Sequence, residues 1–241
     1  MGSVTLEHDT YHAIGLVGGL GPGATVHYYE RLTKEFAKLS TTPRLLISHA
    51  ELKFVLDRVG AGALDELAEY LAGHVESLAR AGAEFAAIGA VTPHICARQV
   101  RARISLPFVD LIDCTRAELA RRRARRIVVL GTRFVMRSDM YGRLDGFEVV
   151  KLASDALDFV HANYMKIAAT GAVAGSGADI EGLRAIAQGS VRNQGVEVVV
   201  LAGTELSLVF NEIDCGFPAL DCARAHIDAI VARAIADTPT P

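Results

Sequence analysis

The feature that most constrains this chain is an internal repeat. Residues 82–90 resemble residues 195–203, and each residue of the first segment lies 113 positions before its counterpart (195 − 82). Residues 14–19 resemble residues 127–132 at the same separation. Because similar segments in the same order fold into similar elements, the repeat predicts two structurally related halves.

A shorter match relates residues 113–117 to residues 221–225, at a separation of 108 positions (221 − 113). In both halves, apolar runs that end in glycine or hydroxyl residues alternate with segments in which alanine and leucine recur every three or four positions. The first pattern is typical of buried parallel strands, and the second is typical of helices. The predicted strands are residues 12–17, 43–48, 85–90, 108–111, 127–130, 147–151, 196–201 and 217–220.

Strands that alternate with helices predict a parallel sheet in each half. We therefore expect an α/β fold with two pseudo-symmetric domains, each a parallel sheet flanked by helices. The first domain comprises residues 1–108 together with residues 218–241, and the second comprises residues 109–217. Ligands bind outside the carboxyl ends of parallel strands, so the active site is expected in the cleft between the domains. The strand ends expected at this cleft are Gly18, Ala90, Gly131 and Gly203.

The composition argues against two classes of partner. A net charge of −3 provides no field that attracts nucleic acid or an acidic membrane surface. The basic run at residues 121–126 lies at a predicted helix end, where cations offset the helix dipole; contact with phosphate is the alternative. The sequence shows no leader and no apolar run long enough to cross a membrane. We expect neither a nucleic-acid partner nor a membrane partner.

The cysteines show neither C-x-x-C pairing nor the spacing of metal ligands. This pattern is typical of a reducing compartment, so we expect a cytoplasmic protein without a metal site. Cys96 is expected to be a small buried hydrophobe. The alternative is a displaced nucleophile, because the start of a helix lowers the pKa of a thiol. The four cysteines are Cys96, Cys114, Cys215 and Cys222.

Residues 18–21 form a glycine-rich loop at the end of the first predicted strand. The loop lacks the complete G-x-G-x-x-G pattern of dinucleotide-binding folds, so a nucleotide is not indicated. Backbone N–H groups in such a loop, at the amino end of a helix, hold small anions. Gly18 and Gly19 are therefore candidates for binding a substrate carboxylate.

Residues 14–25, IGLVGGLGPGAT, are similar to the opening I-G-I-L-G-G-M-G-P-x-A-T of the aspartate/glutamate racemase superfamily. Residues 90–94 (AVTPH) and 203–206 (GTEL) resemble the two catalytic motifs of that family, C-N-T-x-H and C-T-E-L. The resemblance covers nearly the whole chain. It implies catalysis without a cofactor on a small carboxylate-bearing, amino-acid-like substrate, and it implies a homodimer.

The sequence departs from the family at the two positions that carry the chemistry. The cysteines that exchange a proton with the substrate Cα in the racemases correspond to Ala90 and Gly203, and the motif asparagine corresponds to Val91. Neither alanine nor glycine carries a transferable proton, so ordinary two-thiol racemisation is not expected. The two small residues are expected to leave space for a larger substrate or for a water molecule.

The resemblance implies a set of substrate-binding candidates around these positions. Thr92, Thr132 and Thr204 offer hydroxyls to carboxylate oxygens, or they serve only as helix caps. Lys53 lies near the basic substrate-binding residue of the family, or it is a plain surface lysine. Asp158 stands where some members carry a second basic residue, which favours a less acidic substrate. The set is completed by Gly18, Gly19, Ala90, Val91 and Gly203.

The candidates for acid–base catalysis in place of the thiols are Glu205, His49 and His94. Glu205 is either the base itself or a structural support. His94 is either catalytic or packed, and His49 follows a strand end and otherwise belongs to a solvated loop. The remaining ionisable candidates are Glu51, Asp158 and His161. We therefore expect an isomerase, lyase or hydrolase that uses histidine, a carboxylate or activated water; the alternative is a catalytically silent carboxylate-binding protein.

Overall fold

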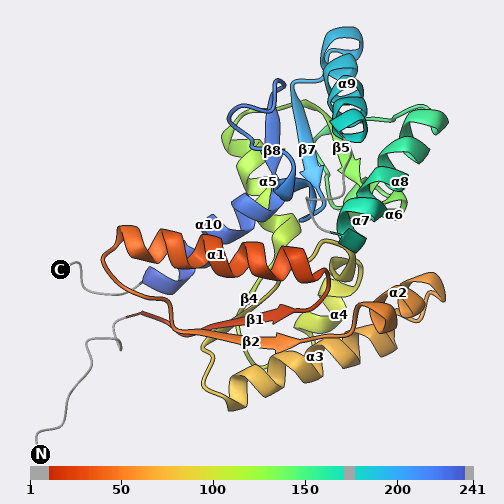
Figure 1. Cartoon of the computed structure of the whole chain (residues 1–241). Coiled ribbons are helices and arrows are strands. Elements are labelled where there is room, and N and C mark those ends of the chain that lie inside the picture. The colour runs from red at the N-terminus through yellow and green to blue at the C-terminus, as the bar shows by residue number, and fades with distance from the viewer. Residues whose placement is uncertain (1–10, 171–176, 237–241) are drawn as a thin grey trace, which may run out of the picture.

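The computed structural model describes residues 11–170 and 177–236, which form two four-stranded parallel sheets (Figure 1). The strand orders are β2-β1-β3-β4 and β6-β5-β7-β8, so the expected fold class is confirmed. The first sheet contains β1 (Ile14–Gly18), β2 (Leu45–His49), β3 (Phe85–Ile88) and β4 (Phe108–Val109). The second contains β5 (Arg126–Gly131), β6 (Glu148–Val150), β7 (Val198–Ala202) and β8 (Ala219–Asp221).

The helices lie between consecutive strands, as a parallel sheet requires. In the first half they are α1 (Pro22–Lys38), α2 (Leu52–Gly60), α3 (Leu64–Arg80), the 3₁₀ segment η2 (Thr92–Cys96) and α4 (Ala97–Arg101). In the second half they are α5 (Leu111–Arg121), α6 (Arg133–Arg137), α7 (Asp139–Gly142), α8 (Ser154–Thr170), α9 (Gly177–Gln194), the 3₁₀ segment η4 (Leu206–Leu208) and α10 (Cys222–Ile235).

The register of the strands confirms the main repeat. β1 pairs with β3 at Gly15 and Ala86, and β5 pairs with β7 at Val128 and Val199. Both residues of the second pair lie 113 positions after those of the first (128 − 15 and 199 − 86). The two central strand pairs therefore occupy equivalent places in the two sheets.

The shorter sequence match, which paired Asp113 with Asp221, is wrong. Ala86 pairs with Phe108 in the first sheet, and the equivalent Val199 pairs with Ala219 in the second. The separation between the outer strands is therefore 111 positions (219 − 108), because the connection from β3 to β4 is two residues longer than that from β7 to β8. The structural counterpart of Asp221 is Asp110.

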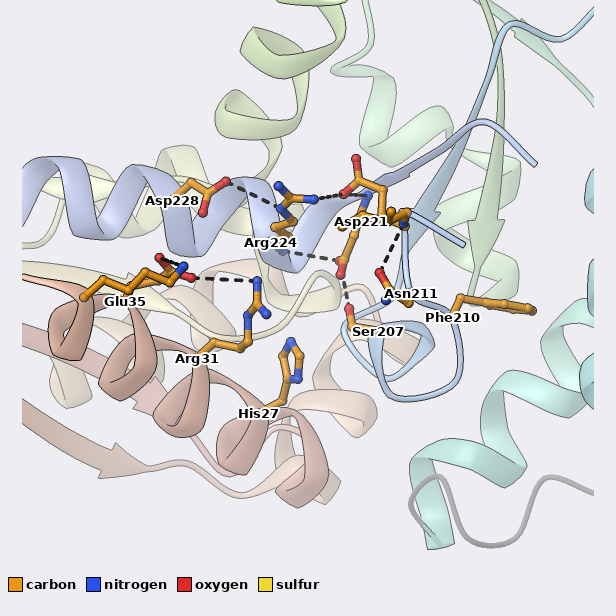
Figure 2. Close-up of a pocket in the computed structure, with 12 residues that line it drawn as sticks. His27, Arg31, Glu35, Ser207, Phe210, Asn211, Asp221, Arg224 and Asp228 are labelled. Atoms are coloured by element: carbon orange, nitrogen blue, oxygen red, sulfur yellow. Dashed lines mark hydrogen bonds and ion pairs between the residues drawn. The ribbon is translucent and has the colours of Figure 1, made fainter. Parts of the chain in front are cut away.

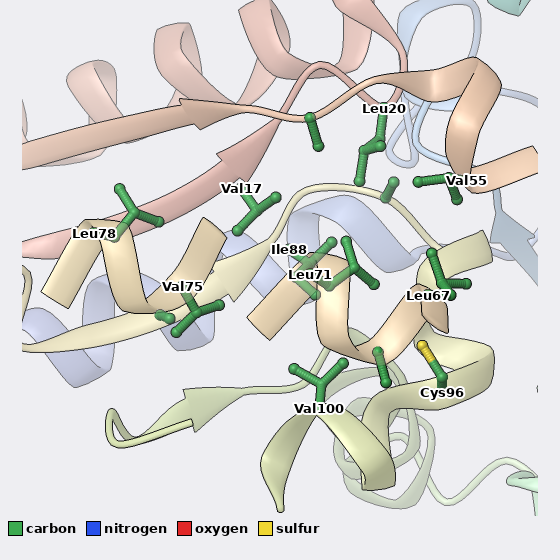
Figure 3. Packing of buried hydrophobic residues seen from close by; sticks show 14 of the residues in the cluster. Val17, Leu20, Val55, Leu67, Leu71, Val75, Leu78, Ile88, Cys96 and Val100 are labelled. Carbon is green, nitrogen blue, oxygen red and sulfur yellow. The ribbon is translucent and has the colours of Figure 1, made fainter. Parts of the chain in front are cut away.

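Helix α3 covers one face of the first sheet because its apolar residues lie on one side. Leu67, Leu71, Val75 and Leu78 recur every three or four positions and are buried in the same apolar cluster as Val17 of β1 (Figure 3). Burial of side chains of this size contributes about 1.5–3 kcal/mol each to the stability of the fold. The sheet is thereby fixed to α3.

The two halves exchange their last helices. Helix α10 follows β8 of the second sheet, but its Ile227 and Ile230 are buried in one cluster with Ile14 of β1. Helix α5 follows β4 of the first sheet, and its Leu119 is buried in one cluster with Ile127 of β5. Each half therefore completes the core of the other.

The expected division into residues 1–108 with 218–241 and residues 109–217 stays a prediction. The packing of α10 against β1 supports assigning the final helix to the first domain. However, the boundary at residue 218 falls before β8, which pairs with β7 in the second sheet. Residues 219–221 therefore belong to the second half, because their hydrogen bonds to β7 place them in the second sheet.

The basic run at residues 121–126 forms ion pairs at the end of α5. Arg121 and Arg122 both pair with Glu118, and Arg126 pairs with Glu148. This arrangement supports the interpretation as a helix end. Among residues 11–170 and 177–236, no helix is long and apolar enough to cross a membrane.

Candidate active site

Two contacts join the carboxyl ends of the strands across the two halves. The Tyr141 hydroxyl, after β5, donates a hydrogen bond of 3.2 Å to the backbone oxygen of Thr92, after β3. The Glu205 carboxylate, after β7, lies against Gly21, after β1, where a Cβ would be 2.1 Å from Glu205 Oε1. The loops that follow β1, β3, β5 and β7 therefore meet, as parallel sheets in two similar halves predict.

The glycine loop after β1 is shaped by close packing. Gly19 has φ +81°, and a Cβ there would be 2.3 Å from the backbone oxygen of Ala50. The N–H of Gly19 donates to Thr25 Oγ1 at 2.9 Å, and a Cβ on Gly18 would be 2.6 Å from Thr25 Cγ2. The Gly19 N–H expected to hold a substrate carboxylate therefore already has an internal acceptor.

The space beside Gly203 is filled by Tyr164 of α8. A Cβ on Gly203 would be 2.2 Å from Tyr164 Cε2 and 3.0 Å from two other ring atoms. The expectation that the small residue at position 203 leaves room for substrate or water is therefore wrong, because a side chain from another element occupies that room. Tyr164 was not a sequence candidate, since it lies 39 residues before Gly203 in no recognisable motif.

Tyr164 and Glu205 form a buried hydrogen-bonded pair. The Tyr164 hydroxyl donates to Glu205 Oε2, and the Thr204 hydroxyl donates to the same oxygen at 3.1 Å. Glu205 is 3% exposed, and burial raises its pKa despite these two hydrogen bonds. Burial and the nearby Glu205 carboxylate raise the pKa of Tyr164 well above 10. Both groups therefore retain their protons to a higher pH than they do in water.

His94 is fixed by the backbone on both sides of its ring. Nδ1 donates to the oxygen of Ala90 at 2.8 Å, and Nε2 accepts from the N–H of Leu111 at 3.2 Å. Burial lowers its pKa, so the ring stays neutral. A histidine whose two nitrogens are both engaged has no site for a substrate proton, so the geometry favours the packed role over the catalytic one.

His49 and Lys53 lie on the surface. His49 ends β2, and its ring lies against Gly19, where a Cβ would be 2.8 Å from His49 Cδ2. Lys53 is on α2 and pairs with Asp57 at 2.6 Å, and its side chain is 77% exposed. Glu51 is exposed beside them, and its N–H donates to the Tyr70 hydroxyl. His49 thus adjoins the glycine loop, whereas the ammonium of Lys53 already has an anionic partner.

The candidates that follow β5 are engaged with one another. Thr132 caps α6 by accepting from the N–H of Val135 at 3.4 Å, so its role as a helix cap is confirmed. Asp158 pairs with Arg133 at 2.9 Å, and His161 Nδ1 accepts from the Arg133 N–H at 3.3 Å. The negative charge of Asp158 is therefore offset locally.

The segment that presents Tyr141 has an unusual backbone. Asp139, Met140 and Tyr141 have φ values of +52°, +51° and +66°, in the left-handed region that non-glycine residues rarely adopt. Such residues cost on the order of 1–3 kcal/mol each and concentrate at functional sites. This strained turn places the Tyr141 hydroxyl within hydrogen-bond distance of the backbone oxygen of Thr92.

The first motif is apolar apart from Thr92 and the buried His94. Ala90 and Val91 are 5% and 4% exposed and belong to two different apolar clusters. Thr92 begins η2 without a side-chain capping bond, so the cap interpretation fails at this residue. Its hydroxyl is left for another partner.

No cysteine is placed as an activated thiol. Burial raises the pKa of Cys96 and of Cys114 to about 12, and it also raises the pKa values of Cys215 and Cys222. Cys96 lies in the apolar cluster under α3, as expected for a small buried hydrophobe. Across the described ranges, no three histidine, cysteine or acidic side chains are grouped to hold a metal ion.

Comparison with known proteins agrees with this geometry. The model of the family described as Asp/Glu/hydantoin racemase matches residues 17–230. The chain is 21% identical to the broad specificity amino-acid racemase RacX of Bacillus subtilis (strain 168), over 92% of this chain and 98% of the relative.

Two solved structures share the fold closely. One is described as a candidate Asp/Glu racemase from Yersinia pestis, with 25% identity and a TM-score of 0.79 over 91% of this chain and 97% of the other. The second is an aspartate racemase homologue from Pyrococcus horikoshii OT3, with 26% identity and a TM-score of 0.75 over the same shares of the two chains.

Proposed function

Because this chain belongs to the Asp/Glu/hydantoin racemase family, we propose that it is a cofactor-independent enzyme of small, amino-acid-like carboxylates. In this proposal Tyr164 and Glu205 replace the thiol that the family motif has at the position of Gly203. The observation that carries the proposal is the tyrosine ring, 2.2 Å from where a Cβ on Gly203 would stand, with its hydroxyl bonded to a buried carboxyl.

The substrate class follows from the relatives and from the charges. The relative from Bacillus subtilis is named a broad specificity amino-acid racemase, which supports an amino-acid-like substrate. Arg133 already pairs with Asp158, and Lys53 already pairs with Asp57. Two cations that could bind a second carboxylate thus have anionic partners, which supports a substrate less acidic than aspartate or glutamate.

On the Gly203 side, the pair acts as a proton source. Burial raises the pKa of both groups, so each holds its proton to a higher pH than it does in water. In the resting pair the Tyr164 hydroxyl is the donor and Glu205 Oε2 is the acceptor. When the hydroxyl gives its proton to a carbanionic substrate carbon, the tyrosinate oxygen becomes the acceptor and, below the raised pKa of Glu205, takes the carboxyl proton. A carboxylate remains on Glu205, and in the reverse direction that carboxylate is the general base.

On the Ala90 side, the first motif supplies no acid or base of its own. Ala90 and Val91 are apolar, and both nitrogens of His94 are bonded to the backbone. Proton transfer on one face of the substrate supports isomerisation or cleavage of a carbon–carbon or carbon–nitrogen bond over racemisation. Hydrolysis by a water that Glu205 activates is the remaining reaction class.

The second candidate function is a catalytically silent carboxylate-binding protein. The apolar first motif and the buried, internally bonded Glu205 favour it. The two candidates differ in turnover and not in binding. They are therefore separated only when both are measured on the same variants.

Isotope exchange provides the first test. We expect the protein to catalyse no rapid exchange of the Cα proton of D- or L-aspartate, glutamate or alanine for deuterium, followed by ¹H NMR in D₂O. The physical reason is the absence of two opposed thiols. Rapid exchange in both enantiomers of any of these would contradict one-face chemistry.

Variants of the pair provide the second test, after a thermal-shift screen of small carboxylates has identified a substrate. Tyr164→Phe and Glu205→Gln are expected to lower kcat by at least 10²-fold, the usual size of a general acid–base contribution, with little change in substrate Kd. Tyr29→Phe, at an exposed tyrosine on α1, is the control. Unchanged turnover in both pair variants refutes their role, and binding without turnover in the wild type supports the silent protein.

A further inference from the structure

A cavity of about 450 Å³ lies outside the candidate active site, between α1, α10 and the segment that follows Glu205 (Figure 2). His27, Arg31 and Glu35 reach it from successive turns of α1, and Arg224 and Asp228 reach it from α10. The cavity is large enough for a small metabolite. The family motifs include none of these side chains, and the sequence repeat includes only Arg224.

The two arginines of the cavity have only loose partners. Arg31 lies 4.0 Å from Glu35, and Arg224 lies 3.4 Å from Glu212 and 3.9 Å from Asp228. Well-formed bonds between a guanidinium and a carboxylate are about 2.7–2.9 Å long, so the N–H groups of both arginines are largely unused. The two guanidiniums come from different helices and border one cavity.

The acids around the cavity divide into two kinds. Glu35 is bonded to Lys38 at 2.5 Å, and Glu212 is bonded to Arg122. Asp221 accepts from the Ser207 hydroxyl at 2.8 Å and from the backbone N–H groups at the start of α10. Within residues 11–170 and 177–236, Asp228 has only the long contact to Arg224, and burial raises its pKa. One carboxylate therefore remains available beside two available guanidiniums.

We propose that this cavity binds a small zwitterion of the amino-acid or short-peptide class. Its carboxylate pairs with Arg31 and Arg224, and its ammonium pairs with Asp228. The lining carries both signs, so a pure anion meets four carboxylates and a pure cation meets two loosely paired guanidiniums, whereas a molecule with both charges has partners for both. His27, whose pKa is lowered by burial, adds a neutral ring that can donate or accept one hydrogen bond.

The cavity is lined by neither Tyr164 nor Glu205, but it lies near this proposed catalytic pair. Ser207 and Asn211, on its wall, belong to the segment that begins directly after Glu205. Leu208 of the same segment packs against α1, where a Cβ on Gly23 would be 3.2 Å from Leu208 Cδ1. A ligand here contacts both halves of the molecule.

Saturation-transfer difference NMR tests the proposal on the full-length protein with four probes. Glycylglycine and γ-aminobutyrate carry both charges, acetate carries only the anion, and ethylammonium carries only the cation. Each probe is titrated against the wild type, Arg31→Gln and Arg224→Gln. Arg98→Gln, at an exposed arginine on α4, is the matched control. Thr92→Val, at a substrate-binding candidate after β3, reports on binding at the candidate active site.

We expect a zwitterion to bind at least tenfold more tightly than either single-charge probe. The two cavity variants should weaken its binding at least tenfold, and Arg98→Gln and Thr92→Val should leave it unchanged. Equal binding of acetate, or unchanged zwitterion binding in both cavity variants, overturns the proposal. Binding lost only in Thr92→Val places the probe at the active site, which refutes this cavity site without affecting the proposed function.

Discussion

At Gly203 the backbone and the Tyr164 ring are in direct contact, and glycine is required because the ring takes the volume of a side chain. We expect Gly203→Ala to destabilise the protein by about 1–3 kcal/mol, since a methyl group 2.2 Å from a ring carbon forces the ring or the strand end to move. Urea denaturation followed by circular dichroism measures the change.

The control for this substitution is Gly189→Ala in α9, where a Cβ meets nothing within 4 Å. There the change should stabilise the helix by about 0.5–1 kcal/mol, because alanine is the better helix former. If Gly203→Ala lowers the free energy of unfolding no more than Gly189→Ala does, Tyr164 does not occupy the position that we assign to it.

The pH dependence of stability distinguishes Glu205 from an ordinary surface acid. Burial raises its pKa in the folded state above the ordinary 4.5, so its contribution to stability is fully present below pH 4.5 and is lost as the pH rises through the raised value. Relative to Glu205→Gln, the wild type should therefore become less stable as the pH rises from 4.5 to the raised pKa of Glu205. Unfolding free energies at each pH test this.

Glu84 provides the matched case of opposite sign. Hydrogen bonds from the Ala13 N–H and from His12 lower its pKa, so its contribution is present above pH 4.5 and is lost as the pH falls through the lowered value. The cost of Glu84→Gln should shrink toward acid pH, while that of Glu205→Gln grows. Parallel curves for the two variants would contradict the assigned environments.

Among the elements, α5 and α10 begin in equivalent ways. Asp110 accepts from the N–H groups of Ile112 and Asp113, and Asp221 accepts from those of Ala223 and Arg224. Each helix therefore starts with a carboxylate cap that satisfies two otherwise unpaired donors. The duplication preserved the cap although the loop before it changed length.

We expect Asp221→Ala to cost about 0.5–2 kcal/mol and Asp221→Asn to cost much less, because asparagine is as good a cap as aspartate. At Asp110 the asparagine variant should also be costly. There the carboxylate pairs with Arg143 at 2.9 Å. Burial acts to raise the pKa of Asp110, but nearby His94 and the charge and hydrogen bond of Arg143 outweigh it and lower the pKa to about 2. Equal effects of asparagine at both positions, by urea denaturation, would contradict this difference.

Across the whole molecule, the exchange of α5 and α10 makes the two halves depend on each other. His226 of α10 accepts from the Tyr28 hydroxyl at 2.8 Å and donates to the oxygen of Val109 at 3.0 Å. It thereby joins α1, β4 and α10 in one buried network. Neither half keeps a complete core when the other unfolds.

We expect Ile230→Ala, a fully buried change in α10, to cost about 2–5 kcal/mol, whereas Ile213→Ala, at an 84% exposed side chain, should cost less than about 0.5 kcal/mol. Hydrogen exchange read by mass spectrometry should show β1 and β5 losing protection together. Loss of protection in β1 alone would mean that the halves open independently.

The sequence by itself determined the elements and their duplication. Apolar spacing in residues 64–80 predicts the face of α3 that packs, and the separation of 113 positions predicts the equivalent central strands. The sequence also indicated the family, because the loop at residues 18–25 and the segments that resemble the two family motifs are each a short continuous stretch of residues. Such signals are local, so they can be read without knowing what packs against them.

Only the tertiary structure decided what surrounds those motifs. Tyr164 reaches Gly203 because α8 packs against the second sheet, His94 is fixed because α5 begins beside it, and α10 closes a core to which it is not joined in sequence. Contacts between segments far apart in the chain depend on packing directions and side-chain lengths. No pattern along the chain indicates these directions and lengths. The contact of Tyr164 with Gly203 was therefore found only from the fold.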